Sequence, residues 1–418
     1  MAPEKKIDGA DFNPERFSLN DIEEIRDGII SKEDLVEKLH TGEALILHGK
    51  RRSVAVGYGL LVKVNTAIGL NGAATQRNIE IELEKIRSLS SVGYAPDMMM
   101  DLSITQTTPP MYERTIDLFG GTVGTLPHYL CYDFKTHSID PDKLLAMIEA
   151  QAKAGVAFMT LHPTPTKELY IKSTQTRATP ITSRGGGIVI DDLLHHDRRE
   201  NIIADLFPTI LTILKKYGMA VSIGTTFRPS NVLDALDIVH REEYESQAIF
   251  IELAKQAGVP VMMEGVGHMT LDKIGEYAEM VKRYGVPFMP LGPTTTDAAV
   301  GEDHISSAIG SAYMAFLGAA HVLNSMTREE HTGRIPTLES ILEGLRAARI
   351  AEHTVNIARF PQVLEPDRDI AQKRAGNYTC VVEGGLFTES AERRFSMGCS
   401  RCGAECPLLL NQRSAGEL

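Results

Sequence analysis

The chain lacks tryptophan, contains few other aromatic residues (6% in all) and has only five cysteines among its 418 residues. It also lacks any apolar run of the roughly 18 residues that a membrane-spanning helix requires, and its first residues form no apolar export signal. We therefore expect a cytoplasmic protein without a membrane partner. The formal net charge of −12 disfavours nucleic acid as a partner. The expected partner is a small molecule.

Three of the five cysteines lie close together near the C-terminus, at Cys399, Cys402 and Cys406. This arrangement is not a disulfide framework, and in a reducing compartment it indicates a metal site. Three thiolates are one ligand short of closing a tetrahedral zinc site or a four-iron cluster. The C-x₂-C-x₃-C spacing favours an iron–sulfur cluster with an open position, because no further Cys or His follows it. A zinc site completed by a distant histidine is the alternative.

Short β-rich runs alternate with amphipathic stretches through the middle of the chain, a pattern typical of βα units around a parallel sheet. Eight such runs predict an α/β fold of the (β/α)₈ barrel type, with its active site at the carboxyl ends of the strands. The predicted helices span residues 76–89, 140–154, 201–217, 232–257 and 271–284. The predicted strands span residues 60–65, 97–102, 122–127, 156–162, 180–183 (the weakest), 220–224, 260–264 and 287–292.

We expect four regions along the chain. Residues 1–59 form a small N-terminal extension that plugs or covers the barrel, and residues 60–335 form the barrel itself. Residues 336–386 form a C-terminal helical segment, and residues 387–418 form a cysteine-rich, cluster-binding tail. The tail has little apolar content, so it is expected to be ordered by its metal or by another surface.

Polar residues follow the predicted strands where a barrel places its active site. Glu264 and His268 flank two glycines that allow a tight turn, so a carboxylate and a metal-binding imidazole can face one cavity. Ser183-Arg184-Gly185 combines a guanidinium with a glycine-rich turn, which suits a phosphate or carboxylate. Arg228 is a second candidate anion clamp, and a surface salt bridge is its alternative role. Other polar strand-end residues are Asn65, Asp101, Ser103, Tyr129, His162 and Asp297, followed by Asp303 and His304.

These segments together resemble the radical S-adenosylmethionine family of the thiamine pyrimidine synthase. The resemblance runs from about residue 61 to residue 406. Its most specific pieces are Lys63-Val-Asn65-Thr-Ala-Ile-Gly69, Met100-Asp-Leu-Ser103, Gly124-Thr-Leu-Pro127, Ser183-Arg-Gly-Gly186, Glu264-Gly-Val-Gly-His268, Leu291-Gly-Pro293, Thr296-Asp297, Asp303-His-Ile305 and the C-terminal cysteines.

The resemblance implies a barrel that binds aminoimidazole ribotide and a 4Fe-4S cluster whose unligated iron holds S-adenosylmethionine. An electron from a donor such as flavodoxin or ferredoxin then yields a 5′-deoxyadenosyl radical. The resemblance also implies a homodimer in which each cysteine tail reaches the active site of the partner subunit.

The resemblance assigns roles to individual residues. Glu264 and the three cysteines would be catalytic, and His268 and His331 would bind a second metal, zinc or iron. Only the resemblance singles out His331. The residues that would contact the ribotide or the adenosyl group are Asn65, Met100, Tyr129, His162, Ser183, Arg184, Gly185, Thr225, Arg228 and Glu264.

The sequence departs from the family pattern at three places. Three residues, not four, separate Cys402 from Cys406; Thr225-Thr-Phe-Arg-Pro229 replaces Asp-Gly-Leu-Arg-Pro; and Met289 stands where a tyrosine is expected. These changes favour the family branch that converts aminoimidazole ribotide into 5-hydroxybenzimidazole, a cobamide precursor, over a phosphomethylpyrimidine synthase. Two alternatives belong to other classes. One is a zinc-dependent barrel lyase that uses Glu264, His268 and His331, and the other is a non-catalytic iron–sulfur sensor.

Overall fold

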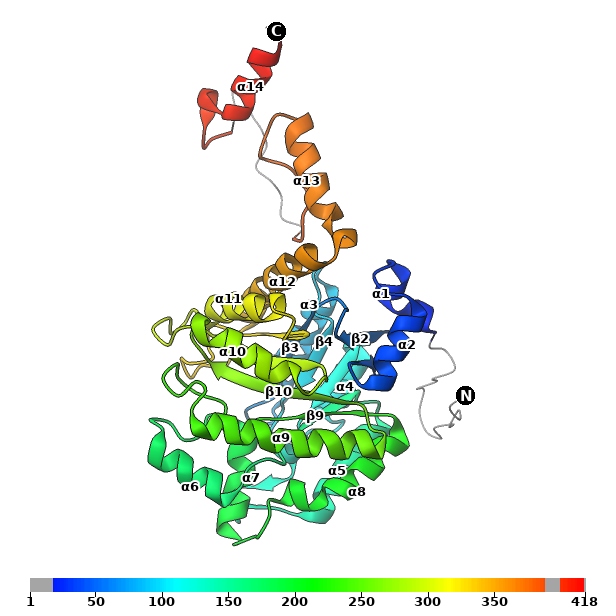
Figure 1. Ribbon diagram of the computed structural model, residues 1–418, viewed down its shortest axis with the longest axis vertical. Coiled ribbons are helices and arrows are strands. Elements are labelled where there is room, and N and C mark those ends of the chain that lie inside the picture. Colours follow the sequence, from blue (N-terminus) through cyan, green and yellow to red (C-terminus); the bar gives the residue numbers. More distant parts are fainter. Residues whose placement is uncertain (1–17, 388–398, 417–418) are drawn as a thin grey trace.

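A computed structural model describes residues 18–387 and 399–416. Its centre is a parallel eight-stranded sheet in the order β11-β10-β9-β8-β5-β4-β3-β12, which curls into a nearly closed barrel (Figure 1). The predicted (β/α)₈ barrel is confirmed. The strands are β3 Lys63–Ile68, β4 Met98–Asp101, β5 Thr122–Thr125, β8 Phe158–Leu161, β9 Ala220–Ile223, β10 Val261–His268, β11 Phe288–Thr294 and β12 Val322–Ser325.

In the barrel sheet, one predicted strand is wrong and one observed strand was not predicted. Residues 180–183 form a loop that ends at Ser183, whose side chain accepts a hydrogen bond from the Gly186 amide and so caps a helix. A capping serine and a nearby proline, which lacks an amide donor, both disfavour a strand here. The true eighth strand is β12, which pairs with β3 in parallel.

The barrel closes between β11 and β12 through hydrogen bonds that involve both backbone and side-chain groups. The His321 amide donates to the carbonyl of Phe288, and the Phe288 amide donates to Nδ1 of His321 at 3.0 Å. Nδ2 of Asn324 donates to the carbonyl of Pro290 at 2.8 Å. Side chains therefore supply part of the hydrogen bonding that a ladder supplies elsewhere in the sheet.

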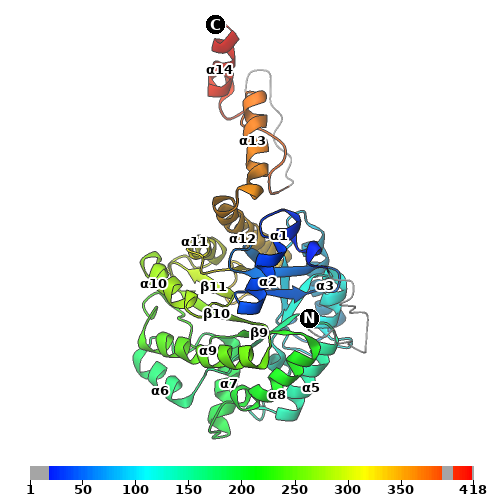
Figure 2. The same cartoon turned by 45° about the vertical axis from the view of Figure 1, so that its right-hand side comes forward.

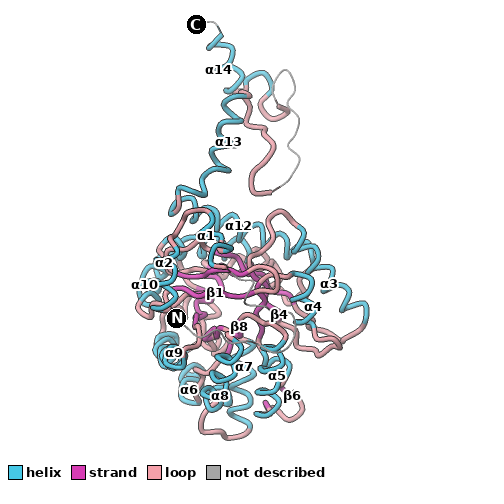
Figure 3. Tube along the Cα trace, turned by 90° about the vertical axis from the view of Figure 1, so that its right-hand side faces the viewer, coloured by secondary structure: helices cyan, strands magenta, loops and turns pink. Residues whose placement is uncertain are grey.

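Amphipathic helices surround the strands (Figure 3). Residues 232–237 were predicted as helical, but the observed helix α9 begins only at Ile238. The Asp237 side chain accepts a hydrogen bond from the His240 amide and so caps the start of the helix. The barrel helices are α3 Gln76–Ser91, α4 Met111–Phe119, α5 Pro141–Lys153, α6 Lys167–Thr176, α7 Arg184–His195, α8 Ile202–Tyr217, α9 Ile238–Ala257, α10 Leu271–Lys282, α11 Asp303–Phe316 and α12 Leu338–Arg359.

The N-terminal extension contains α1 Glu23–Arg26, α2 Lys32–Thr41 and an antiparallel hairpin of β1 Ala44–His48 and β2 Ser53–Gly57. Apolar side chains of the hairpin belong to the same buried cluster as residues near the starts of several barrel strands. The hairpin therefore covers the amino end of the barrel and leaves the carboxyl end of the strands to the connecting loops. The contributing residues are Leu45, Leu47, Val54 and Val56 from the hairpin and Met98, Phe158, Ala220, Met262 and Val322 from the barrel.

The C-terminal part of the chain forms an arm. Helix α12 packs on the barrel, and α13 Glu365–Gly376 and α14 Pro407–Gly416 project away from it (Figures 1 and 2). The cysteine trio lies on this arm, just before α14. Within the described ranges, no helix is both long enough and apolar enough to cross a membrane.

Candidate active site

A layer of polar side chains lies inside the barrel, above the apolar cluster that the hairpin closes. Side chains two residues apart on a strand share a face, and four residues of the layer follow a member of the inner apolar cluster by two positions. The Asn65 amide donates from Nδ2 to Oδ1 of Asn324 at 2.6 Å, joining β3 to β12. Oδ1 of Asn65 is buried and has no partner within the described part of the chain. Thr160 follows Phe158, Ser222 follows Ala220, Glu264 follows Met262, and Asn324 follows Val322.

Among the described residues, Glu264 is the carboxylate of this layer. Its Oε1 accepts a hydrogen bond from the Thr160 hydroxyl at 2.6 Å. Burial raises the pKa of Glu264, and the Thr160 hydroxyl and the Arg228 charge partly oppose that shift. A raised pKa makes this carboxylate a stronger proton acceptor than an exposed glutamate.

Two neutral imidazoles face each other at the carboxyl ends of β5 and β8. Nε2 of His162 lies 3.1 Å from Oγ of Ser183, and its buried Nδ1 has no partner among the described residues. Burial lowers the pKa of His162 well below its ordinary value and lowers the pKa of His128 to about 3. The two rings meet edge to face, with centroids 5.5 Å apart. His128 was not predicted, although its place beside Tyr129 after a strand was a usable signal.

The N-terminus of α7 approaches these rings closely. A Cβ on Gly185 would lie 2.5 Å from Cε1 of His162 and 3.0 Å from Nε2 of His128, so only glycine fits there. A Cβ on Gly186 would likewise lie 2.5 Å from the hydroxyl oxygen of Thr226. The first amides of a helix carry partial positive charge, so this terminus favours an anion.

Two arginines lie beside this helix end. The Arg184 guanidinium carbon is 5.7 Å from the centroid of the Tyr129 ring, and its Nη1 donates to Oδ1 of Asn71 at 2.9 Å. Burial raises the pKa of Tyr129 to about 12, with smaller opposing effects from Arg184 and Arg228, so its phenol stays protonated at neutral pH. Asn71, which orients Arg184, was missed because no motif marks a polar residue in the β3–α3 loop.

The remaining predicted contact residues lie in the same region. Met100 and Tyr129 belong to the buried apolar cluster that also contains the hairpin side chains. Thr225 is buried, and its hydroxyl has no partner within the described residues. Arg228 is half-buried, and its Nη1 lies 3.5 Å from the Thr225 carbonyl, a long contact. These unsatisfied groups are available to a ligand.

A histidine pair forms a second cluster, with His268 at the end of β10 and His331 after β12. Nε2 of His268 lies 3.2 Å from Nε2 of His331, while Nδ1 of each ring contacts a carboxylate: Asp297 at 2.6 Å and Asp303 at 2.7 Å. Carboxylates in this position fix the tautomer of a metal-binding histidine. Two nitrogens on one tetrahedral zinc, each about 2.0–2.1 Å from it, stand roughly 3.3 Å apart. The donors fit a divalent metal, and burial lowers the pKa of His268, which keeps its ring neutral for ligation.

The cysteine trio is folded into one turn. The Gly403 amide donates to the Cys399 carbonyl at 2.9 Å, and the Cys406 amide donates to the Gly403 carbonyl at 3.3 Å. Backbone amides of Cys402 and Arg401 lower the pKa of the Cys399 thiol, which favours the thiolate. The donor set fits a three-cysteine cluster. The arm does not place it at the strand ends of its own barrel (Figure 2).

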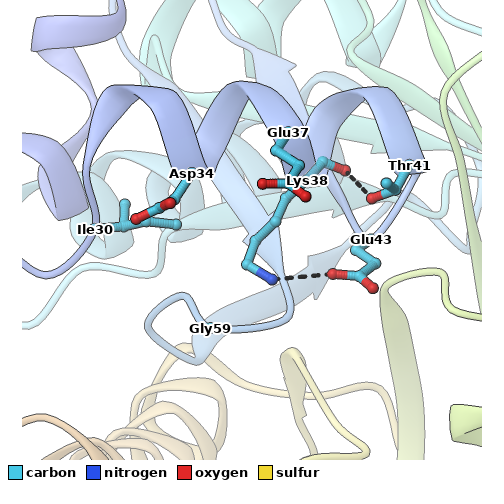
Figure 4. A pocket seen from close by; sticks show the side chains of 7 residues that line it. All are labelled: Ile30, Asp34, Glu37, Lys38, Thr41, Glu43 and Gly59. Carbon is cyan, nitrogen blue, oxygen red and sulfur yellow. Dashed lines mark hydrogen bonds and ion pairs between the residues drawn. The ribbon is translucent and has the colours of Figure 1, made fainter.

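A groove of about 330 Å³ lies in the N-terminal extension, between α2 and the turn at Gly59 (Figure 4). Its lining includes Asp34, Glu37 and Glu43, and Nζ of Lys38 already pairs with Glu43 at 2.9 Å. The groove is on the side of the hairpin, not among the strand-end residues. It plays no part in the site described above.

Comparison with known proteins places the whole arrangement in a family. A model of the Radical SAM ThiC family matches residues 18–413. The 5-hydroxybenzimidazole synthase BzaA of Eubacterium limosum is 33% identical over 405 residues, covering 92% of this chain and 93% of that protein. The phosphomethylpyrimidine synthase of Ignicoccus hospitalis is 35% identical over 396 residues, covering 89% of each. A dihydropteroate synthase from Thermus thermophilus superposes with a TM-score of 0.40 at 14% identity, covering 72% of this chain and 98% of that one.

The matches extend over nearly the whole described chain, including the strand-end motifs and the cysteine trio. The relatives are named synthases, so the chain is an enzyme. The family match favours a radical S-adenosylmethionine enzyme over the two alternatives, a non-catalytic sensor and a zinc-dependent lyase. The family implies a 4Fe-4S cluster, S-adenosylmethionine, a small-molecule substrate and a redox partner. The chain belongs to the Radical SAM ThiC family.

Proposed function

We propose that this enzyme converts aminoimidazole ribotide into 5-hydroxybenzimidazole. The observation that carries the proposal is the arrangement at the barrel mouth: an anion site beside two neutral imidazoles and a buried carboxyl group. A phosphorylated heterocycle has matching parts, a dianion at one end and a flat, hydrogen-bonding base at the other. Glu264 comes from β10, His128 and His162 come from the segments that follow β5 and β8, and the anion site comes from the N-terminus of α7.

The phosphate end of the substrate would bind at the N-terminus of α7. Arg184 and Arg228 supply guanidinium groups, and the first amides of α7 supply donors along the helix axis. Gly185 and Gly186 permit this approach because a Cβ at either position would collide with neighbouring side chains. Asn71 holds Arg184 from the opposite loop.

The base end would bind over the polar layer. Glu264 can accept a proton from the amino group or ring nitrogen, and His162 can use its free Nδ1 as a donor or acceptor. His128 and Tyr129 border the same space, and Asn65 offers its unpaired Oδ1. When S-adenosylmethionine is bound to the reduced cluster, the pair supplies the 5′-deoxyadenosyl radical that starts the rearrangement.

The departures from the family pattern lie where they can change the product. Thr225 and Thr226 are buried, and their hydroxyls have no partner in the described structure, at the segment where the family pattern has a carboxylate. Met289 is fully buried in the inner apolar cluster, where a tyrosine would add a hydroxyl. We propose that this less acidic, more apolar floor directs the rearrangement toward the benzimidazole. Phosphomethylpyrimidine synthase is the second candidate, supported by the 35% identical relative.

We further propose that His268 and His331 hold zinc or iron. Asp297 and Asp303 orient both imidazoles so that their Nε2 atoms converge. A metal there would supply Lewis acidity beside the substrate. Because the cysteine trio lies on a projecting arm, the proposal includes a homodimer in which each arm reaches the barrel of the partner.

The test is product identification. Reconstituted enzyme is incubated without oxygen with aminoimidazole ribotide, S-adenosylmethionine and a reductant, and the products are separated and weighed by mass spectrometry. Fluorescent 5-hydroxybenzimidazole supports the proposal. Hydroxymethylpyrimidine phosphate supports the second candidate, and neither product with full S-adenosylmethionine cleavage overturns both substrate assignments.

A further inference from the structure

A small hairpin outside the barrel mouth is anchored to the C-terminal half of α7. It consists of β6 Tyr132–Asp133 and β7 Ser138–Ile139, which pair antiparallel. Asp192 on α7 is fully buried, and its Oδ1 accepts from the Ile139 amide at 2.9 Å. Arg198 donates from Nε to Oδ2 of the same carboxylate at 2.7 Å. The buried Asp192 carboxylate, paired with the partly exposed Arg198, holds the hairpin backbone against the helix.

The neighbouring residue, Asp191, faces two histidines. Its Oδ2 lies 2.8 Å from Nδ1 of His137, at the tip of the hairpin, and its Oδ1 lies 3.2 Å from Nδ1 of His195, one turn further along α7. The two imidazoles stack, with centroids 4.1 Å apart and planes inclined by 12°. Nδ1 of His195 also lies 3.0 Å from the Asp191 carbonyl, and the Tyr132 hydroxyl donates to Oδ2 of Asp191.

We propose that His137, Asp191 and His195 form a divalent transition-metal site that clamps the hairpin to α7. Two imidazole nitrogens and one carboxylate oxygen are a donor set that zinc accepts in protein sites with an open position. The ligand atoms of the three residues lie within 4.8 Å of one another. Two of the separations, 2.8 and 3.2 Å, are close to the roughly 3.3 Å expected for two donors on one tetrahedral zinc.

The metal-free arrangement can convert to the bound one by small rotations. Parallel stacked rings do not aim both Nδ1 lone pairs at one point, so each imidazole must turn about χ2, a torsion with a broad energy minimum. Both rings are about half-exposed, at 46% and 50% of the side chain, so neighbours do not block the turn. The His195 contact to the Asp191 carbonyl is released in the process.

The local electrostatics favour a cation at this place. Asp191 brings the one carboxylate of the three-residue donor set, and aspartate is ordinarily charged at neutral pH. The site also lies in the last turns of α7, where the helix dipole is negative. The Tyr132 hydroxyl supplies the second hydrogen bond that ligating carboxylates ordinarily receive. This site is separate from the His268 and His331 pair, which lies at the end of β10 and after β12.

The site is tested by titrating the metal-free, full-length chain with Zn²⁺ alone in a calorimeter. Because the cysteine trio and the His268 pair also bind zinc, all proteins in the comparison carry C399S, C402S, C406S and H331A. Against this background, H195A and H137A are compared with H196A. His196 is the matched control, since its Nε2 contacts the Thr136 carbonyl of the same hairpin but it is not in the donor set.

We expect one zinc equivalent in the background chain and in H196A. H195A and H137A should each weaken that binding at least tenfold, and Co²⁺ should give a visible absorption band in the background chain but not in H195A. Equal isotherms in the background chain and H195A would overturn the site, and so would an equal loss in H196A, which would indicate binding to any surface histidine. If the background variants do not fold, H195A is compared with the unmodified chain. H195A should then bind one zinc equivalent fewer, and equal zinc binding by the two proteins would overturn the site.

Discussion

Two sets of candidate metal donors in this molecule are built in opposite ways. The cysteine trio occupies eight consecutive residues, and its geometry comes from one local turn closed by backbone hydrogen bonds. The histidine pair joins residues 63 apart in sequence, and each ring is held by a carboxylate from a third or fourth segment. A local donor set can travel on an arm, whereas a long-range set exists only while the barrel is folded.

The largest expected effect follows from the position of the cysteine trio, which lies outside the barrel core. Cys402→Ser should abolish S-adenosylmethionine cleavage because a three-thiolate cluster cannot lose a ligand. The barrel's free energy of unfolding should change by less than about 0.5 kcal/mol, as for other substitutions outside the core. Cleavage assays and thermal denaturation followed by circular dichroism measure the two effects. A large loss of barrel stability would show that the two regions are not independent.

The next effect concerns the barrel mouth. Glu264→Gln should reduce turnover by roughly 10²–10⁴-fold, the usual contribution of a positioned proton-transfer group, while the iron and sulfide content stays unchanged. Thr160→Val is the graded control, since it removes only the hydroxyl that bonds to Glu264. Its loss should be smaller. Equal losses for the two variants would mean that the hydrogen bond, not proton transfer, matters.

A third prediction addresses the carboxylates that hold the histidine pair. Asp297→Asn and Asp303→Asn should each weaken metal binding about 10–100-fold, because they remove the groups that orient the ligands. Metal content after dialysis against a graded chelator gives the affinity. Asp272→Asn, an exposed carboxylate at the start of α10, is the matched control and should have no effect. Unchanged affinity in Asp297→Asn would count against a metal at this pair.

The smallest effect lies at the joint between the two regions. On α12, which connects the barrel to the arm, burial raises the pKa of Glu352 from 4.5 to about 7. A carboxyl group with a raised pKa costs stability as the pH rises from its unfolded value to its folded one. Glu352→Gln should therefore gain roughly 1–3 kcal/mol over the wild type between about pH 4.5 and 7 and keep a constant advantage above that. Denaturant titrations at several pH values measure the free energy of unfolding of both proteins. A difference between the two proteins that does not change with pH would contradict the prediction.

Much of the barrel could be predicted because its signals are local. The β-rich runs overlap seven of the eight observed strands, and the strand-end rule brought Glu264, Arg184 and His162 to one end of the barrel. The error at residues 180–183 arose because a capped loop before a helix also contains short apolar stretches. Strand β12 escaped prediction because its four residues, Val322–Ser325, include Asn and Ser at the active-site end.

The contacts between segments could not be predicted in the same way. His331 has no local motif, and only the fold brings its Nε2 to 3.2 Å from that of His268. Asn71 was missed for the same reason, since its importance depends on its hydrogen bond to Arg184 from another segment. Helix α7 carries one feature of each kind. The capping side chain of Ser183 is a local signal for the start of the helix. The His137–Asp191–His195 cluster forms only in the folded chain, where the hairpin lies against α7.

The sequence by itself determined the cysteine trio, the alternation of strands and helices, and the order of polar strand ends, because each of these depends on spacing within a few residues. The tertiary structure alone decided which of those ends face one another, which carboxylate holds which histidine, and that the trio stands away from its own barrel. The physical reason is that hydrogen bonds, burial and pKa shifts depend on distances in space, and closing the barrel brings together residues that are far apart along the chain.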